Sequence, residues 1–142
     1  MKILVAVDGS KTSLDAVNWL VAHADWYRQP PAVELVTVHH PVSKLARGAL
    51  RIKQDELERW YRKQGEANLA QAKKRLHKAR VHFRSHVLVG PVAETIVRHA
   101  KRAKCDLIVI GTSGMGAAGN LLAASVASKV LDLATLPVLL AR

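Results

Sequence analysis

The sequence predicts an α/β fold, a doubly wound domain on a five-stranded parallel sheet, and three observations support this prediction. Apolar strand-like runs alternate with segments of helical periodicity from one end of the chain to the other. The first, fourth and fifth runs lack polar alternation, as expected for parallel strands that helices cover on both faces. A length of 142 residues is typical of one domain. We therefore expect residues 1–142 to form a single domain.

The strand-like runs give the order of the elements. The expected strands are residues 2–7, 33–38, 81–89, 106–110 and 136–141. Helical periodicity follows the first strand, where Ser10 is a plausible N-cap and Leu14, Val17 and Leu20 fall on one face. A further helix is expected over residues 90–103, with Pro91 in its first turn, where the missing N–H costs nothing.

The region between the second and third strands is long and highly charged, and Gly48 and Gly65 interrupt its helical pattern. We expect a loop near residues 41–50, followed by a helix that ends at about Ala79. The apolar residues that mark a buried face of this helix are Leu57, Trp60, Tyr61, Leu69, Ala72 and Leu76.

Positive charge is concentrated in the middle of the chain. The net charge is +11, and the segment from Lys44 to Lys104 holds 17 of the 22 Lys and Arg residues against five acidic residues. One interpretation is a solvated helix face laced with Glu–Arg and Glu–Lys pairs. The other is a surface for an acidic partner, either nucleic acid or an anionic membrane surface. Too few aromatic residues are present for a single-strand stacking platform.

Cysteine and histidine usage predicts no tightly bound metal. The single cysteine, Cys105, excludes an internal disulfide and clustered-thiol zinc sites, and we expect a small buried thiol there. The seven histidines show no metal-binding spacing, and the adjacent His39 and His40 leave opposite faces of a strand. The apolar runs are too short for a membrane span or a signal peptide. We expect a cytoplasmic protein without membrane insertion.

The stretch "GTSGMGAAGNLLAASVAS" at residues 111–128 invites a phosphate-binding interpretation. Gly114, Gly116 and Gly119 match Gly-x-Gly-x-x-Gly, but the next strand carries no acidic residue to bind a ribose, so we reject dinucleotide binding. The P-loop lysine is also absent. The pattern that fits better is Gly111 and Gly114 in a small-residue loop that leads into a helix, because such backbone N–H groups can hold an anion.

Three segments resemble the universal stress protein family: "MKILVAVDGS", "VGPVAETIVRHAKRAKCDLIVIGTSGMG" and "LPVLLAR". The resemblance spans essentially the whole chain and is loosest between residues 41 and 80. It implies a Rossmann-like, adenine nucleotide alpha hydrolase-like sheet in the order 3-2-1-4-5. Ligands of open α/β sheets bind where the strand order reverses, here between the first and fourth strands.

The resemblance also implies a nucleotide site, residue by residue. Asp8 matches the carboxylate that binds ribose hydroxyls, and Val38 matches the position whose backbone contacts adenine. The remaining expected contacts, chiefly to phosphate, are Gly9, Gly111, Gly114, Ala124, Ser125 and Val126. Ala124 stands where the family has its third glycine. An alanine is strained there if φ is positive, crowds a phosphate oxygen if the backbone must approach closely, and does little harm in helical geometry.

The function implied is a stress-response protein that binds ATP, or the related AMP or ADP, as a regulatory ligand, with or without Mg²⁺. No general base or acidic pair is placed for hydrolysis, so we expect no catalytic residues and at most slow ATPase activity. A homodimer through the strand at 136–141 is also implied. Two alternatives stay open: a dimeric stress protein without nucleotide that acts through protein partners, and an electrostatic binder of nucleic acid or acidic surfaces through residues 44–104.

Overall fold

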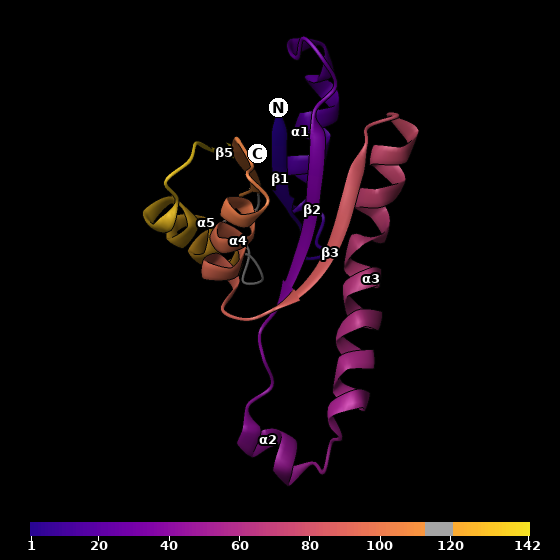
Figure 1. Cartoon of the computed structure of the whole chain (residues 1–142), viewed down its shortest axis with the longest axis vertical. Helices are drawn as coiled ribbons and strands as arrows, with labels where there is room; N and C mark the ends of the chain where they lie inside the picture. Colours follow the sequence, from indigo (N-terminus) through magenta and orange to yellow (C-terminus); the bar gives the residue numbers. More distant parts are fainter. Residues whose placement is uncertain (113–120) are drawn as a thin grey trace.

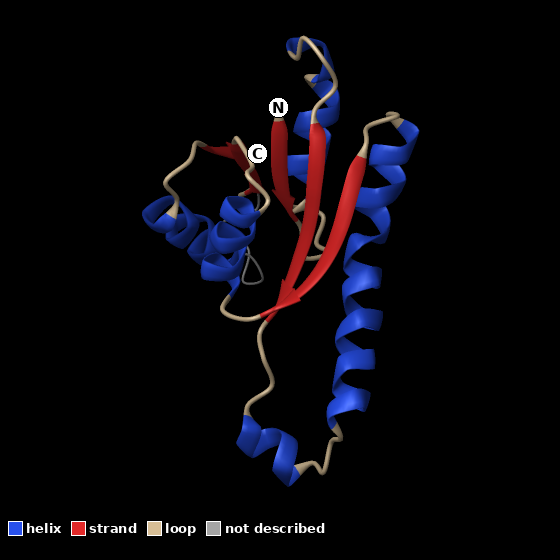
Figure 2. Ribbon diagram, viewed as in Figure 1, coloured by secondary structure: helices blue, strands red, loops and turns tan. Residues whose placement is uncertain are grey.

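The computed structural model describes the backbone of residues 1–112 and 121–142, and the side chains of residues 1–112 and 125–142. Strands and helices alternate along the chain (Figure 1, Figure 2). The elements in order are β1 (Lys2–Ala6), α1 (Leu14–Ala22), the 3-10 helix η1 (Ala24–Trp26), β2 (Ala32–His39), α2 (Lys44–Ala49), α3 (Gln54–Lys78), β3 (Phe83–Val89), α4 (Val92–Arg102), β4 (Leu107–Gly111), α5 (Leu121–Leu133) and β5 (Val138–Ala141).

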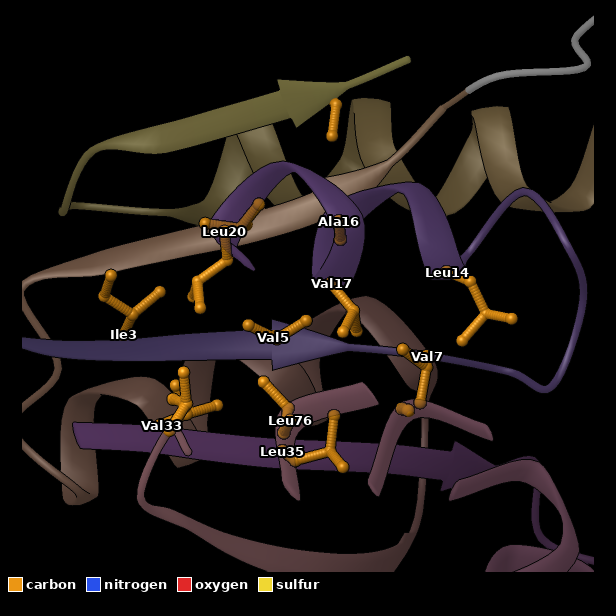
Figure 3. Packing of buried hydrophobic residues seen from close by; sticks show 14 of the residues in the cluster. Ile3, Val5, Val7, Leu14, Ala16, Val17, Leu20, Val33, Leu35 and Leu76 are labelled. Atoms are coloured by element: carbon orange, nitrogen blue, oxygen red, sulfur yellow. The ribbon is translucent and has the colours of Figure 1, made fainter. Parts of the chain in front are cut away.

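The five strands form one parallel sheet in the order β3-β2-β1-β4-β5, as predicted. The central strand β1 shows why its sequence is apolar without interruption. Ile3 and Val5 point into one buried cluster with α1 and α3 (Figure 3), while Leu4 and Ala6 point into a second cluster with α4 and α5. The sheet is thus covered on both faces, and the doubly wound α/β prediction is confirmed.

Helix α1 begins later than the sequence predicted. Ser10 is not its N-cap, because the helix starts at Leu14 and Ser13 occupies the N-cap position. Ser10 instead closes the preceding turn, where its Oγ accepts a hydrogen bond of 3.1 Å from the N–H of Ser13. Leu14, Val17 and Leu20 are buried as expected.

The prediction of a loop over residues 41–50 was wrong, because the short helix α2 forms there. The hydroxyl of Ser43 caps it by accepting a 3.0 Å hydrogen bond from the N–H of Ala46. No residue of α2 is buried. Figure 1 shows α2 and the start of α3 extending beyond the sheet.

Helix α3 runs through Gly65 without a break and ends at Lys78, so the predicted helix that ends at about Ala79 is confirmed. A Cβ at Gly65 would overlap both methyl groups of Val87, so the glycine lets α3 lie close against β3. All but one of the six apolar residues expected to face inward are buried; Trp60 is the exception, with 48% of its surface exposed. Its neighbour Tyr61 takes the inward position.

The outer face of α3 is charged and carries ion pairs. Arg59 lies 3.7 Å from Asp55, and Lys73 lies 2.5 Å from Glu66. These pairs agree with the solvated-face interpretation of the central basic segment. None of the helices within residues 1–112 and 121–142 is both long and apolar enough to span a membrane.

Candidate functional site

A cavity of about 740 Å³ lies at the carboxyl ends of β1, β2 and β4, beside α4 and α5. Its wall is largely apolar, with side chains from Val36, Val38, Val92, Ile96, Ile110 and Val126. Polar and charged groups come from Asp8, Ser13, His40, Glu94, Ser125 and Lys129. Strands β1 and β4 are neighbours whose following helices cover opposite faces of the sheet, so the cavity lies where the strand order reverses.

Five of the eight residues that the sequence predicted for the site line this cavity: Asp8, Val38, Gly111, Ser125 and Val126. Gly9 does not line it. Gly9 has a φ of +86°, and a Cβ there would lie 2.8 Å from Oδ1 of Asn68 on α3, so packing and turn geometry account for this glycine. Gly114 lies outside the described residues. Of Ala124 only the backbone is described, and it belongs to α5.

Asp8 follows β1 and organises the turn into α1. Its Oδ1 accepts hydrogen bonds from the N–H of Ser10 at 2.9 Å and from the Ser10 hydroxyl at 2.5 Å. The N–H of Asp8 donates to the Oγ of Ser13 at 3.2 Å. A carboxylate offers about four acceptor sites, so two donors from Ser10 leave it able to accept from a ligand hydroxyl.

The same hydrogen bonds keep Asp8 ionised. Partial burial by itself raises the pKa of the Asp8 carboxyl, but the hydrogen bonds donated by the hydroxyl and the N–H of Ser10, with a smaller contribution from Ser13, outweigh it and hold the pKa below its usual value. At neutral pH the cavity therefore contains a carboxylate, which accepts hydrogen bonds and does not donate them.

Gly111 ends β4 against the turn between β1 and α1. A Cβ at Gly111 would collide with the carbonyl oxygen of Thr12 and lie 3.2 Å from the Cα of Ser13. The close approach of two backbones thus requires glycine here, and this requirement holds whether or not a ligand is bound.

Helix α5 presents one face to the cavity. Because α5 begins at Leu121, Ala124 and Ser125 are its fourth and fifth residues, not its first. The sequence had placed them at the helix start. The backbone at Ala124 is helical, so the alternative in which an alanine is strained by a positive φ does not apply.

Lys129 brings a positive charge to the cavity wall. Its Nζ lies 2.5 Å from Oε1 of Glu94 on α4. The hydrogen bond from Lys129 lowers the pKa of the Glu94 carboxyl below its usual value. A cationic group on the same helix face as Ser125 suits a phosphate. In this structure the ammonium group of Lys129 is paired with Glu94.

The comparisons with known proteins agree with this architecture. A model of the universal stress protein family matches residues 1–142 of the chain. The chain belongs to the universal stress protein family. Universal stress protein MJ0531 of Methanocaldococcus jannaschii is 31% identical over 142 residues, covering 99% of this chain and 81% of that protein. Universal stress protein YxiE of Bacillus subtilis is 31% identical over 150 residues, covering 99% and 98%.

Solved structures share the fold of this universal stress protein. The protein MJ0577 superposes with a TM-score of 0.77 at 24% identity, covering 99% of this chain and 94% of that one. A universal stress protein in complex with cAMP has a TM-score of 0.67 at 22% identity, with coverage of 100% and 96%. A universal stress protein of Archaeoglobus fulgidus in complex with dAMP has a TM-score of 0.66 at 23% identity, with coverage of 100% and 98%.

Sequence reasoning on this universal stress protein missed several residues of the cavity, chiefly His40, Glu94 and Lys129. A signal for Lys129 was present, because residues four apart on a helix share a face and Lys129 is four residues beyond Ser125. No such signal existed for Glu94, because only the packing of α4 beside α5 brings it to the cavity.

Proposed function

We propose that this protein binds an adenine nucleotide in the 740 Å³ cavity as a regulatory ligand. The observation that carries the proposal is the convergence of Asp8, Val38, Gly111 and Ser125 on one largely apolar cavity at the reversal of strand order. Relatives of the same fold support it, since one has been solved with cAMP and another with dAMP.

The adenine ring would lie against β2. On the side of β2 that faces β1, the carbonyl of Val36 accepts a 2.9 Å hydrogen bond from the N–H of Val7. Backbone groups of alternate residues in a strand point to the same side, so the N–H and C=O of Val38 face the β1 side as well. Pairing between β1 and β2 ends at Ala6 and Val36, so Val38 lies beyond the last β1 partner. The edge of an adenine ring can therefore form hydrogen bonds with the N–H and the C=O of Val38.

With the adenine ring against β2, the ribose would lie near Asp8 and the phosphates near Ser125 and Lys129. The ionised Asp8 carboxylate accepts hydrogen bonds from ribose hydroxyls. Ser125 is the fifth residue of α5, past the four N–H groups that a helix leaves unpaired, so we assign its contact to the hydroxyl. Lys129 supplies charge to the phosphates. We propose ATP as the ligand, with any Mg²⁺ carried by the phosphates and not by a protein site.

We also propose that two copies pair through β5. This strand ends the sheet, its only strand neighbour in the described sheet is β4, and Leu140 is 43% exposed. An apolar edge strand with unpaired backbone groups is a template for a second chain.

Calorimetric titration of ATP into nucleotide-free protein, at low and at high salt, tests the nucleotide proposal. We expect one ATP per chain and affinity largely retained in salt, because ribose and adenine contacts are screened little. Asp8→Ala should bind at least tenfold more weakly, about the loss of one charged hydrogen bond. Asp25→Ala, at an exposed position on η1 away from the cavity, is the matched control.

Two results would contradict the proposal. The first is no saturable binding by the wild type. The second is equal affinity of the wild type and Asp8→Ala, which would remove Asp8 from the site. Binding that disappears in high salt would instead favour the electrostatic alternative through residues 44–104.

A further inference from the structure

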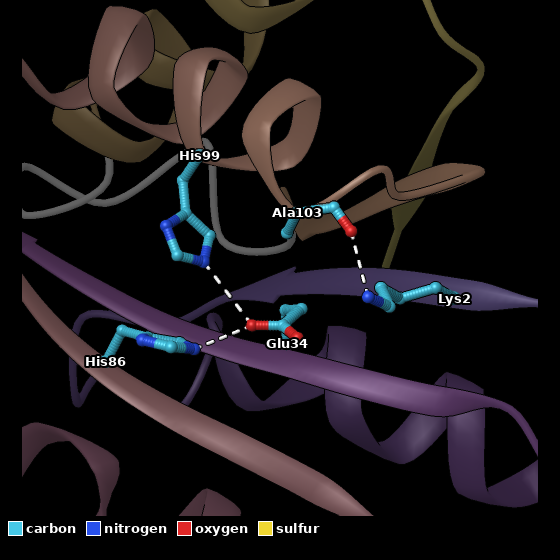
Figure 4. A network of polar contacts seen from close by, with 5 residues as sticks. All are labelled: Lys2, Glu34, His86, His99 and Ala103. Atoms are coloured by element: carbon cyan, nitrogen blue, oxygen red, sulfur yellow. Dashed lines mark hydrogen bonds and ion pairs between the residues drawn. The ribbon is translucent and has the colours of Figure 1, made fainter.

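Three side chains from separate elements converge on the sheet face covered by α4 (Figure 4). Oε2 of Glu34, on β2, lies 2.6 Å from Nε2 of His86 on β3 and 3.4 Å from Nε2 of His99 on α4. Each of the three residues offers one ligand atom such that all three atoms lie within 4.8 Å of one another. This cluster could not be predicted from sequence spacing, because 52 residues separate Glu34 from His86 and 13 more lead to His99.

The carboxylate of Glu34 is placed where an ionised group is costly. Only 8% of its side chain is exposed, and no other charged residue of the described chain is buried. No Lys or Arg among the described residues forms an ion pair with it; its partners are the two imidazoles. Buried charges in proteins are normally paired with an opposite charge or bound to a metal ion. Two histidines that face one buried carboxylate supply the ligands for a metal ion.

We propose that Glu34, His86 and His99 bind a Zn²⁺ ion. Two imidazole nitrogens and one carboxylate oxygen are a ligand set that zinc uses with three protein ligands. Such a set does not suit Ca²⁺ or Mg²⁺, which prefer oxygen ligands alone. Thiolate ligands are not needed.

One of the separations among these ligand atoms already fits this ion, and a second fits after a small shift. Zinc bonds of about 2.0–2.1 Å at tetrahedral angles place neighbouring ligand atoms ~3.3 Å apart. The separation between Glu34 and His99 already has this value, at 3.4 Å. His86 must move away from Glu34 by several tenths of an ångström, and its side chain is 31% exposed, which leaves it room to do so. The same exposure gives water access to the fourth coordination position.

The ion would tie α4 to the sheet beside the cavity. Ile96 of α4 lines the cavity and lies one turn before His99, while Val36 and Val38 of the cavity follow Glu34 on the same face of β2. Zinc bound by β2, β3 and α4 together stabilises the folded state, because the unfolded chain does not hold the three ligands in place.

The test uses the full-length chain without an affinity tag, freed of metal by a chelator and kept without nucleotide. Zn²⁺ is titrated in competition with a fluorescent zinc indicator, and Co²⁺ is added separately to record the visible absorption of a tetrahedral site. We expect one ion per chain and a higher thermal midpoint with Zn²⁺. Glu34→Gln, His86→Ala and His99→Ala should each lower the zinc affinity at least tenfold.

Two controls keep the result interpretable. Glu34→Gln retains the shape and a carbonyl acceptor for the histidines, so it separates loss of the metal ligand from loss of folding. His82→Ala, at an exposed histidine just before β3, should bind zinc as the wild type does. Absence of zinc binding by the wild type overturns the proposal. So does equal zinc binding by the wild type and the three ligand variants, because the ion would then be held elsewhere.

Discussion

At the residue scale, the ion pair between Glu94 and Lys129 can be broken at little cost in free energy. Their side chains are 37% and 56% exposed, and water screens the interaction between exposed charges of this kind, so the pair contributes little to stability. Both residues line the cavity. A nucleotide phosphate would compete with Glu94 for the ammonium group of Lys129.

We therefore expect opposite effects from the two members of the pair. Lys129→Gln should weaken ATP binding about fivefold, and Glu94→Gln should strengthen it by a similar factor, since exposed ion pairs of this kind are weak. Adenosine, which has no phosphate, should bind all variants alike. Calorimetry with ATP and adenosine measures this difference, with Lys101→Gln on α4 as the control. Equal changes for ATP and adenosine would show that Lys129 does not act on phosphate.

Residues of the cavity could be predicted from the sequence only where a motif marked them. Asp8, Gly111 and Ser125 stand in segments that follow strands or enter a helix, and all three line one cavity. Glu34 and His86 could not be predicted. Their meeting depends on the register of β2 against β3, in which Val36 lies opposite His86, and on how the side chains lean across it.

At the scale of elements, Gly65 determines how closely α3 packs on β3. The sequence pattern treated Gly48 and Gly65 alike, as interruptions of one helical region. The structure separates them: nothing lies within 4 Å of a Cβ at Gly48, whereas one at Gly65 overlaps Val87. Periodicity identifies the buried face of a helix, but the distance between helix and sheet depends on the partner strand.

Alanine substitutions at Gly65 and Gly48 should therefore change the free energy of unfolding in opposite directions. Gly65→Ala should lower the free energy of unfolding by about 1–2 kcal/mol, because overpacking outweighs the gain in helix propensity. Gly48→Ala should leave it unchanged or raise it by up to about 1 kcal/mol. Urea denaturation measures both. Adding Val87→Ala to Gly65→Ala should recover part of the loss, and no recovery would contradict a clash with Val87.

At the scale of the whole molecule, the sheet order confirms the fold that the sequence and its family resemblance predicted. Alternation of apolar runs and amphipathic helices was sufficient to place all five strands to within about two residues at each end. The least accurate region was residues 41–53, where α2 replaces an expected loop. No buried face marks α2, so hydrophobic periodicity carried no information about it.

The edge strand β5 leads to a prediction about assembly. Light scattering after gel filtration should give twice the 15.5 kDa of one chain at micromolar concentration. Leu140→Lys on β5 should shift the mass to that of one chain. Leu131→Lys, at a comparably exposed leucine on α5, should leave the dimer intact. A wild type that runs as a stable monomer would exclude pairing through β5.

Helix α4 connects the cavity with the cluster of Glu34, His86 and His99. Its first turns, from Val92 to Ile96, form part of the cavity wall, and His99 in its last turns faces Glu34 on the side of the sheet that α4 covers. A ligand that shifts α4 at one end changes the free energy of whatever is bound at the other. By thermodynamic linkage this coupling is reciprocal, so occupancy of the histidine cluster and occupancy of the cavity would alter each other's affinity by the same factor.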